Sequence, residues 1–377
     1  MNTNWEHVPF DNLFEGKQKS HIKSGEGKDT GAYKLFVCSD TEIKRFDEYI
    51  ESGESLVFGT GGKATCHFAN ERFAYSTDCI VAQKKAPNVC TKFYYYYLRK
   101  NRLNAIQQTF SGVGLQHTSK KKIGVLSVPI PTLREQEYIV ARIEELFSEL
   151  DNGVETLRKT KQQLAVYRQA VLKDVFDSVA GCETGTIQSV CCNVVDCPHS
   201  TPTWVDNGKI CLRTTNFKRG YLDLSEKNYV SDETFNKRNA RLIPEPGDVL
   251  YSREGAILGI ACIIPKDLYV CLGQRMMLLR TNERMLGRFL MHYLNSPKVT
   301  SFVSTKIGGS ASPHVNVGDI KEFIVPIPSI AEQQKMLEQI ESRLSVCDSI
   351  EKTVDTALQQ AEAMRQSILK QAFEGRL

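Results

Sequence analysis

The nearest approach to a catalytic motif in this sequence is the glycine-rich run at residues 59–65, Gly-Thr-Gly-Gly-Lys-Ala-Thr. In a P-loop, a first glycine stands five residues before a Gly-Lys pair, and Ser or Thr follows the lysine. Here Val57 occupies the position of the first glycine, and Ala64 follows Lys63. The run is therefore interpreted as a glycine turn between strands. The alternative is a turn whose backbone amides and lysine contact a DNA phosphate.

Metal binding and acid–base catalysis find little support. A cluster of possible metal ligands consists of Cys191, Cys192, Cys197 and His199. It contains no Cys-x-x-Cys pair and has no second cluster, which favours thiols without zinc. His117 and His314 have no obvious nucleophile or carboxylate partner, so a structural or DNA-contacting role is preferred. No Gly-x-Gly-x-x-Gly or Asn-Pro-Pro-Tyr motif is present, and we predict no catalytic residue, metal site or cofactor in this chain.

Polar and basic residues near predicted turns suit contact with DNA. Arg, Lys, Asn and Gln read base edges, and glycine-rich loops let the backbone approach phosphate. The candidates in the first half are Thr60, Gly61, Gly62, Lys63, Gln116, His117, Lys120 and Lys121. Those in the second half are Arg213, Asn216, Ser252, Arg253, Glu254, Gln274, Arg275, Lys306, Gly309, Ser310 and His314. For each of them the alternative is an ordinary solvated surface residue.

Short apolar runs bounded by turn residues predict the strands that position these candidates. In the first half they are residues 35–38, 56–58, 79–82 and 123–127, with a tyrosine-rich helix at 93–103. In the second half they are residues 210–213, 249–252, 260–264 and 276–280, with a counterpart helix at 288–294. The halves share a plan, but their sequences diverge strongly, which is the pattern expected of two modules that read two different targets.

A long segment occurs twice. Residues 128–176 begin with Val-Pro-Ile-Pro, and residues 325–373 repeat this opening at an offset of 197 residues (325 minus 128). The alignment needs no gap, and it extends upstream to a glycine and a histidine, because Gly112 and His117 fall on Gly309 and His314. A register kept over this length indicates a true internal repeat.

Each copy is predicted to be one long helix. Thr132 with Glu135, and Ser329 with Glu332, have the spacing of a capping box just after a proline. Apolar residues then recur at helical spacing and form one stripe on a charged rod. In the first copy the stripe is Ile139, Ile143, Leu146, Leu150, Val154, Leu157, Leu164, Val171 and Val175. In the second it is Ile340, Leu344, Cys347, Ile350, Val354, Leu358, Ala361, Met364, Ile368 and Ala372.

Neither rod can bury its stripe alone, so the natural partner of each is the other copy. One copy leads the chain away from the first half and the other must bring it back, which predicts an antiparallel coiled coil. About 45 residues at 1.5 Å each give a rod of roughly 65–70 Å. Core helices of an ordinary domain are a poor alternative, because these average only about 11–12 residues.

The length, net charge and cysteine content of the chain are compatible with a multidomain nucleic-acid-binding protein. The chain has 377 residues, which suggests two or more domains, and a formal net charge of +4, which allows nucleic-acid binding without the charge density of a histone-like protein. The polar start and the absence of a long apolar run predict no signal peptide and no membrane span. Twelve scattered cysteines without an export signal are expected to be reduced thiols in the cytoplasm.

The motifs together resemble the specificity subunits of type I restriction–modification systems. The resemblance rests on the twin Val-Pro-Ile-Pro-x-x-x-Glu-Gln openings and on the Arg-Gln-x-x-Leu-Lys-x-x-Phe endings at residues 168–176 and 365–373. Segments of the second half at residues 196–202, 246–255 and 273–277 also look like one class of target-recognition domain.

The resemblance implies an α+β fold with two globular target-recognition domains, built on mixed or antiparallel sheets with small helices, and separated by the helix pair. The implied boundaries are 1–127 and 179–324 for the domains and 128–178 and 325–377 for the helices. Each domain would read one half of a bipartite sequence in double-stranded DNA. The helices would dock two methyltransferase subunits, which bind S-adenosylmethionine, while restriction subunits, if present, use ATP and Mg²⁺.

The helix residues assigned to docking and to the coiled coil are Gln136, Ile143, Leu150, Leu157, Arg168, Gln333, Ile340, Val354, Leu358 and Arg365. No catalysis is expected in the chain itself. A coiled-coil adaptor that binds only proteins is the competing class, and a self-contained nuclease or methyltransferase is disfavoured by the missing motifs.

Overall fold

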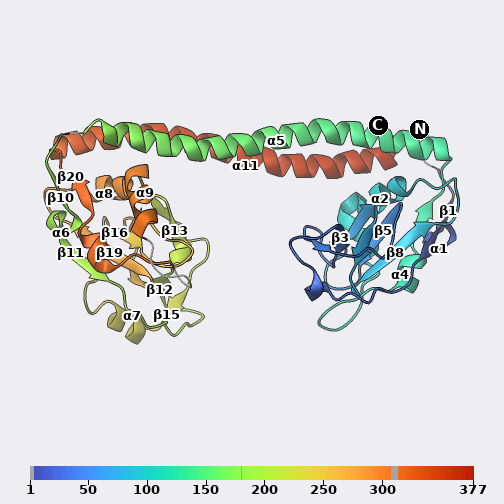
Figure 1. The fold of residues 1–377 in the computed structure, drawn as a ribbon, viewed down its shortest axis with the longest axis horizontal. Coiled ribbons are helices and arrows are strands. Elements are labelled where there is room, and N and C mark those ends of the chain that lie inside the picture. The colour runs from blue at the N-terminus through green and yellow to red at the C-terminus, as the bar shows by residue number, and fades with distance from the viewer. Residues whose placement is uncertain (1–3, 180, 307–312) are drawn as a thin grey trace. The chain divides into compact units, whose positions relative to one another are not determined.

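The computed structural model describes residues 4–179, 181–306 and 313–377, which form two compact units. Unit 1 contains Met1–Arg158 and Asp355–Leu377, and unit 2 contains Lys159–Val354. Each unit combines small sheets and short helices with part of two long helices, α5 (Leu133–Asp177) and α11 (Ile330–Phe373) (Figure 1). The fold is α+β and internally repeated, as predicted.

Unit 1 holds two main sheets. The first has the antiparallel order β2 (Phe14–Gly16), β8 (Cys79–Lys84), β5 (Ser55–Gly59), β6 (Cys66–Ala69). The second has the order β4 (Ile43–Phe46), β3 (Tyr33–Phe36), β7 (Phe73–Tyr75), and its β3–β7 pair is parallel. A separate antiparallel pair joins β1 (His7–Pro9) to β9 (Ser127–Pro129). The helices of this unit are α1 (Phe10–Leu13), α2 (Thr91–Arg99), α3 (Asn104–Gln107) and α4 (Lys120–Gly124), with 3₁₀ turns at Ser24–Glu26 and Lys100–Leu103.

Unit 2 repeats this topology strand by strand. Its antiparallel sheet has the order β11 (Cys191–Asp196), β19 (Met276–Thr281), β16 (Val249–Ser252), β17 (Ala261–Ile263). Its mixed sheet has the order β15 (Tyr229–Val230), β12 (Lys209–Leu212), β18 (Val270–Leu272), with β12 and β18 parallel. The terminal pair is β10 (Thr184–Thr186) with β20 (Ile324–Pro326), and a small extra hairpin pairs β13 (Phe217–Lys218) with β14 (Tyr221–Leu222). The helices are α6 (Ile187–Val190), α7 (Asp232–Arg238), α8 (Gly287–Leu294), α9 (Pro297–Lys306) and α10 (Val317–Lys321), with a 3₁₀ turn at Thr214–Asn216.

One predicted strand is wrong. Residues 123–127 were expected to be extended, but Ile123 and Gly124 belong to α4, and extended structure begins only at Ser127. The cause is local, because the Ser119 side chain accepts a hydrogen bond from the Lys122 amide and caps a helical turn. The equivalent segment of unit 2 is also helical at its start, because α10 runs to Lys321.

The tyrosine-rich helix is also shorter than predicted. It ends at Arg99, and the next turn contains Asn101, Arg102 and Leu103 with φ values of 52°, 54° and 61°. A left-handed conformation at residues with a Cβ cannot continue a right-handed helix. Its counterpart, α8, matches the predicted range of 288–294 within one residue.

Both long helices begin as predicted, with matching capping boxes. The Thr132 amide donates to Glu135 Oε2 at 2.9 Å, and the Glu135 amide donates back to Thr132 Oγ1 at 3.4 Å. Ser329 and Glu332 repeat both bonds at the same distances. These hydrogen bonds lower the pKa of each glutamate below its usual value. Each box satisfies amides that a helix start would otherwise leave unpaired.

The two long helices run antiparallel within each unit taken by itself. In unit 1 the first part of α5 packs with the last part of α11, since Ile143 shares a core with Leu369 and Phe373. In unit 2 the last part of α5 packs with the first part of α11, since Val175 shares a core with Ile340. Most of the predicted stripe is buried or half-buried, but Ile350 and Met364 are 39% and 54% exposed, so these two lie outside the seam.

Reciprocal ion pairs show the internal symmetry of the helices. Asp151 pairs with Arg365 in unit 1, and Arg168 pairs with Asp348 at 2.7 Å in unit 2. The offset of 197 relates the pairs, because 151 plus 197 is 348 and 168 plus 197 is 365. Equivalent positions of the repeat therefore exchange their partners between the two helices. Among the described residues, no helix has the length and apolar character needed to cross a membrane.

Candidate nucleic-acid interface

Three segments of unit 2 meet where the strands of its sheets end. They are residues 253–255 after β16, residues 273–275 between β18 and β19, and residues 313–315 before α10. The Arg253 amide donates to the Arg275 carbonyl at 3.0 Å, and the Val315 amide donates to the Arg253 carbonyl at 2.9 Å. The Gly255 amide donates to the Pro313 carbonyl at 2.9 Å. Residues far apart in the sequence are thus held in one cluster by their backbones.

Unit 1 contains the same cluster, bond for bond. The Thr60 amide donates to the Asp78 carbonyl at 2.9 Å, and the Thr118 amide donates to the Thr60 carbonyl at 2.9 Å. The Gly62 amide donates to the Gln116 carbonyl at 3.0 Å. Gln116 and Thr118 fall on Pro313 and Val315 at the offset of 197 (313 minus 116). The repeated glycine and histidine loop therefore marks equivalent places in the two units, and their side chains differ.

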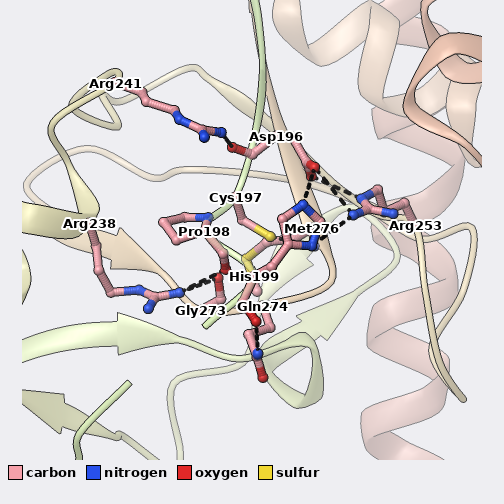
Figure 2. A network of polar contacts seen from close by, with 10 residues as sticks. All are labelled: Asp196, Cys197, Pro198, His199, Arg238, Arg241, Arg253, Gly273, Gln274 and Met276. Carbon is pink, nitrogen blue, oxygen red and sulfur yellow. Dashed lines mark hydrogen bonds and ion pairs between the residues drawn. The ribbon is translucent and has the colours of Figure 1, made fainter. Parts of the chain in front are cut away.

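A buried ion pair supports the unit 2 cluster. The Arg253 guanidinium binds the Asp196 carboxylate through Nε to Oδ1 at 2.9 Å and Nη2 to Oδ2 at 3.2 Å (Figure 2). Their side chains are only 8% and 16% exposed. His199 adds a contact from its Nε2 to Asp196 Oδ2 at 2.9 Å, and its ring is mostly exposed. Arg253, predicted as a DNA contact, thus uses its guanidinium inside the protein, where a two-pronged bond orients the loop.

Arg238 holds the neighbouring loops in place. Its guanidinium is buried and donates to four backbone carbonyls, those of Pro198, Ser200, Leu272 and Gly273, at 2.6–3.2 Å. Figure 2 shows it reaching the loop at Pro198 and the turn at Gly273. This side chain, at the end of α7, ties residues 198–200 to the turn 273–275. Carbonyls that would otherwise lack partners are satisfied in this way.

The exposed side of the unit 2 cluster carries both hydrogen-bond donors and hydrogen-bond acceptors. Gln274 Nε2 donates to the His199 carbonyl, and Thr201 Oγ1 donates to Gln274 Oε1 at 3.4 Å. Arg275 is half exposed, and its Nε lies 3.6 Å from Glu254 Oε1. Residues 254 and 314 form an isolated β-bridge, which brings Glu254 beside His314. Arg213 is exposed and lies over the Trp204 ring at 5.8 Å, as a cation–π pair.

Two further predicted residues of unit 2 face inward. The Asn216 side chain is buried, accepts from the Arg213 amide at 2.9 Å and donates to the carbonyls of Asp223 and Glu226. Ser252 is buried and bonds both backbone groups of Ile260. Both side chains position loops. The side chain of Lys306, and Gly309 and Ser310 entirely, lie outside the described residues.

In unit 1 the predicted glycine turn packs against the predicted histidine. His117 lies over Gly61, where an added Cβ would be 3.2 Å from His117 Cε1. Gly62 has a φ of 75°, in the left-handed region, and Lys63 beside it is exposed. Cys38 completes the turn, because its thiol donates to the Gly61 carbonyl at 2.8 Å. The turn is neutral apart from Lys63, unlike its ionic counterpart in unit 2.

Basic and apolar side chains flank this turn. Gln116 and Lys121 are exposed, and Lys120 Nζ donates to the Gly16 carbonyl at 2.6 Å. The loop between Ser111 and His117 carries Val113 and Leu115 at its tip, both largely exposed. This surface therefore offers cations, backbone amides and apolar contacts together.

The helix residues assigned to docking have several placements. Gln136 and Gln333 are buried and bind the backbone of their own units. Ile143, Ile340 and Val354 are buried, and Leu150, Leu157 and Leu358 are half-buried. Arg168 and Arg365 form the reciprocal ion pairs. These side chains therefore build the helix pair and its attachment.

Four residues of the two clusters were not singled out as sites from the sequence: Cys38, Asp78, Asp196 and Arg238. Asp196 lies in a quoted motif and could have been found there, whereas no local pattern marks the other three. Within the described ranges, no three His, Cys, Asp or Glu side chains gather as a metal site would require. Burial raises the pKa of the Cys191 thiol to about 12, and that of Cys197 in the same direction.

Known proteins resemble this chain along its whole length. A family described as "Type I restriction modification DNA specificity domain" matches residues 2–164 and again residues 172–360. The EcoBI specificity subunit of Escherichia coli is 25% identical over 317 residues, which cover 76% of this chain and 66% of that protein. The EcoKI specificity subunit of Escherichia coli K12 is 22% identical over 300 residues, which cover 73% and 62%. The matches thus span slightly less than two thirds of these relatives' own length.

A solved structure confirms the fold. It is described as "Structural basis underlying complex assembly and conformational transition of the type I R-M system". It matches with a TM-score of 0.69 and 16% identity, and the match covers 99% of this chain and 98% of that one.

Proposed function

This chain belongs to the type I restriction modification DNA specificity family, and from that premise we propose that it is a sequence-specific DNA-binding subunit that reads a bipartite target. Unit 1 reads one half-site and unit 2 reads the other. One observation carries the proposal: two strand-end clusters share their backbone hydrogen bonds but present different side chains. A common frame with separate chemistry is what two different half-sites require.

In this proposal the chain itself carries out no reaction. It presents DNA to two methyltransferase subunits docked along α5 and α11, which bind S-adenosylmethionine, and restriction subunits, where present, supply ATP- and Mg²⁺-dependent cleavage. The four segments 1–127, 128–178, 179–324 and 325–377 serve as two readers and two helices, and the complex works in the cytoplasm, where its DNA is.

A binding assay tests the proposal. The full chain, co-expressed with a type I methyltransferase subunit of its own host, is mixed with a randomised duplex library, and the bound fraction is sequenced. We expect two short preferred blocks with a fixed spacer, and affinity that falls steeply as salt rises. No binding would support the protein-only adaptor instead, and binding without any sequence preference would contradict the reading of a bipartite target.

Exchange of a unit tests the division of labour. Residues 179–324 are replaced by the corresponding segment of another family member with a known target. We expect only one preferred block to change, because the other reader is untouched. A change in both blocks would show that the units do not read independently.

Shortening the helices tests their role in spacing. Deleting one heptad from each copy, at equivalent positions, removes about 10 Å of helix, which is near three base pairs at ~3.4 Å each. The spacer between the preferred blocks should shorten correspondingly, while the blocks stay the same. An unchanged spacer would contradict the role of the helices as a ruler.

A further inference from the structure

We infer that one short turn in each unit carries a base-specific contact, and that the two turns select different bases. In unit 2 the turn ends in Arg275 and selects guanine, and in unit 1 it ends in Asp78 and selects cytosine. This inference rests on the proposed DNA-reading function and deepens it, because it assigns the chemistry of one contact in each half-site.

The two turns are equivalent in the fold. Residues 76–78 connect β7 to β8, and residues 273–275 connect β18 to β19, so each has the same length and joins the mixed sheet to the antiparallel sheet. In each, the carbonyl of the last residue accepts the amide that follows the central strand, from Thr60 or Arg253. Asp78 and Arg275 therefore occupy the same place, with opposite charge.

Arg275 is held in position with its donors available. Its backbone φ is 69°, in the left-handed region that residues other than glycine rarely adopt. Strained conformations of this kind cluster at functional sites. Its guanidinium passes over Gly255, where an added Cβ would lie 3.2 Å from Nη1. Glu254 Oε1 is 3.6 Å from its Nε, while 51% of the side chain is exposed. One carboxylate cannot occupy five N–H donors, so a fork remains for the O6 and N7 acceptors of guanine.

Asp78 offers the opposite chemistry. Its side chain is exposed, and Oδ2 accepts a hydrogen bond from Ser24 Oγ at 2.8 Å, which orients the carboxylate. A carboxylate is repelled by phosphates and only accepts hydrogen bonds. The base-edge group that suits it is the N4 amino group of cytosine. Thr60 fixes the position of the turn, because its amide and its hydroxyl both donate hydrogen bonds to the Asp78 carbonyl.

The test for unit 2 uses Arg275→Ala and Arg275→Lys in the full chain with its methyltransferase partner, with sequencing of the bound library. Arg275→Ala should lower affinity for the preferred sequence about ten- to a hundred-fold and erase a guanine preference at one position. Arg275→Lys keeps the charge but loses the fork, so it should bind unselected DNA like wild type and show a weaker guanine preference. Arg284→Ala is the matched control, because Arg284 is also half exposed and paired with one glutamate, Glu183.

The test for unit 1 uses Asp78→Asn, which keeps size and adds a donor. One position of the other half-site should lose its cytosine preference and accept adenine, the base that asparagine binds in two-pronged fashion. Asp47→Asn is the control, since Asp47 is an exposed unit 1 carboxylate paired with Lys28.

The outcomes separate the two proposals. If wild type shows no sequence preference, the proposed function fails. If wild type is selective but Arg275→Ala weakens all sequences alike, Arg275 contacts phosphate and the inference is overturned. An unchanged preference in Asp78→Asn, with the fold verified by thermal unfolding, overturns the unit 1 half in the same way.

Discussion

Unit 1 and unit 2 hold the same strand ends by different chemistry. In unit 1 the central loop is fixed by the Thr60 hydroxyl, by the Cys38 thiol and by glycines. In unit 2 the equivalent loop is fixed by the buried Asp196–Arg253 pair and by the Arg238 guanidinium. The backbone hydrogen bonds are common to both units, so the frame does not depend on the side chains that fill it.

The two kinds of support place different demands on the neighbouring side chains. A neutral glycine turn places few demands on its neighbours, whereas a buried charge needs its partner. We therefore expect the strand-end loops of unit 2 to depend more on individual side chains than those of unit 1 do. The predictions below test that contrast, beginning with the largest expected effect.

Removing Arg253 should separate the two units most clearly. Arg253→Met leaves the Asp196 carboxylate partly buried without its main partner, which typically costs about 3–5 kcal/mol. Thr60→Val at the equivalent place in unit 1 removes one hydroxyl hydrogen bond and should cost about 1 kcal/mol. Hydrogen exchange of peptides from β11 and β16, compared with β5, measures the free energy of opening in each unit.

A double variant provides the control for this prediction. Asp196→Asn combined with Arg253→Met removes both charges and should recover more than half of the lost stability. Equal losses in Arg253→Met and Thr60→Val would show that the ionic network adds nothing to unit 2.

A buried histidine in α8 should make unit 2 sensitive to acid. Phe93 and Tyr97 pack on Phe373 in unit 1, and Phe289 and Tyr293 pack on Phe176 in unit 2. By this match, His292 occupies the place of Tyr96. Burial, and then the neighbouring Arg288, lowers the pKa of His292 from 6.5 to about 4.

The lowered pKa of His292 makes the folded unit less stable in acid. The unfolded chain takes up a proton near pH 6.5, and the folded unit only near pH 4, so acid favours unfolding. The stabilisation is complete above pH 6.5 and is lost as the pH falls towards 4, by up to about 3 kcal/mol. His292→Phe should flatten this part of the stability curve, measured by hydrogen exchange of α8. A slope unchanged in His292→Phe would assign it to other groups.

How far the sequence predicts this molecule depends on the range of the interactions. The long helices, their capping boxes and most of their stripes were predictable, because caps and apolar spacing are local. The prediction of a strand at 123–127 was wrong, because an apolar run of five residues fits a strand and a buried helical turn equally well.

The clusters could be predicted only in part. The shared offset of Gly112 and His117 with Gly309 and His314 indicated equivalent loops. It could not show that Asp78 stands where Arg275 stands, because that match depends on backbone bonds between segments without sequence similarity. Arg253, Asn216 and Ser252 are of suitable types for DNA contact, and only the tertiary structure reveals that they face inward.

Two glutamines should behave alike in the two units. Gln136 binds the Cys90 amide and the Asn88 and Pro131 carbonyls, and Gln333 binds the Leu286 amide and the Arg284 and Pro328 carbonyls. Replacing either by leucine leaves buried backbone groups unpaired, at a cost of about 2 kcal/mol.

Equal costs within about 0.5 kcal/mol, measured by the same exchange method, would mean that both units attach to the helices by one device. Glu135→Gln and Glu332→Gln are the controls, because they alter the exposed capping boxes and should cost about 1 kcal/mol or less. A loss of stability in only one of the two glutamine variants would show that the units attach to the helices differently.

The smallest effect concerns the reciprocal arginines of the helix pair. Arg168 binds Asp348 and also Glu351 at 2.9 Å, whereas Arg365 binds Asp151 and lies over the Phe147 ring at 4.9 Å. At the offset of 197, Glu351 corresponds to Val154 and Phe147 to Leu344, so each unit supplies a second partner that the other lacks. Both pairs are partly exposed, so Arg168→Met and Arg365→Met should each cost under about 1 kcal/mol.

Salt should distinguish these two arginines. Between 0.05 and 1 M NaCl (roughly 14 Å to 3 Å of screening length), the cost of Arg168→Met should nearly vanish, since both of its contacts are ionic. The cost of Arg365→Met should persist in part, because packing of the guanidinium on a ring survives screening better than an exposed ion pair. Urea unfolding followed by exchange of α5 peptides on either side of residue 158 measures both. Identical salt dependence would mean that the Phe147 ring contributes nothing and that both arginines act through charge alone.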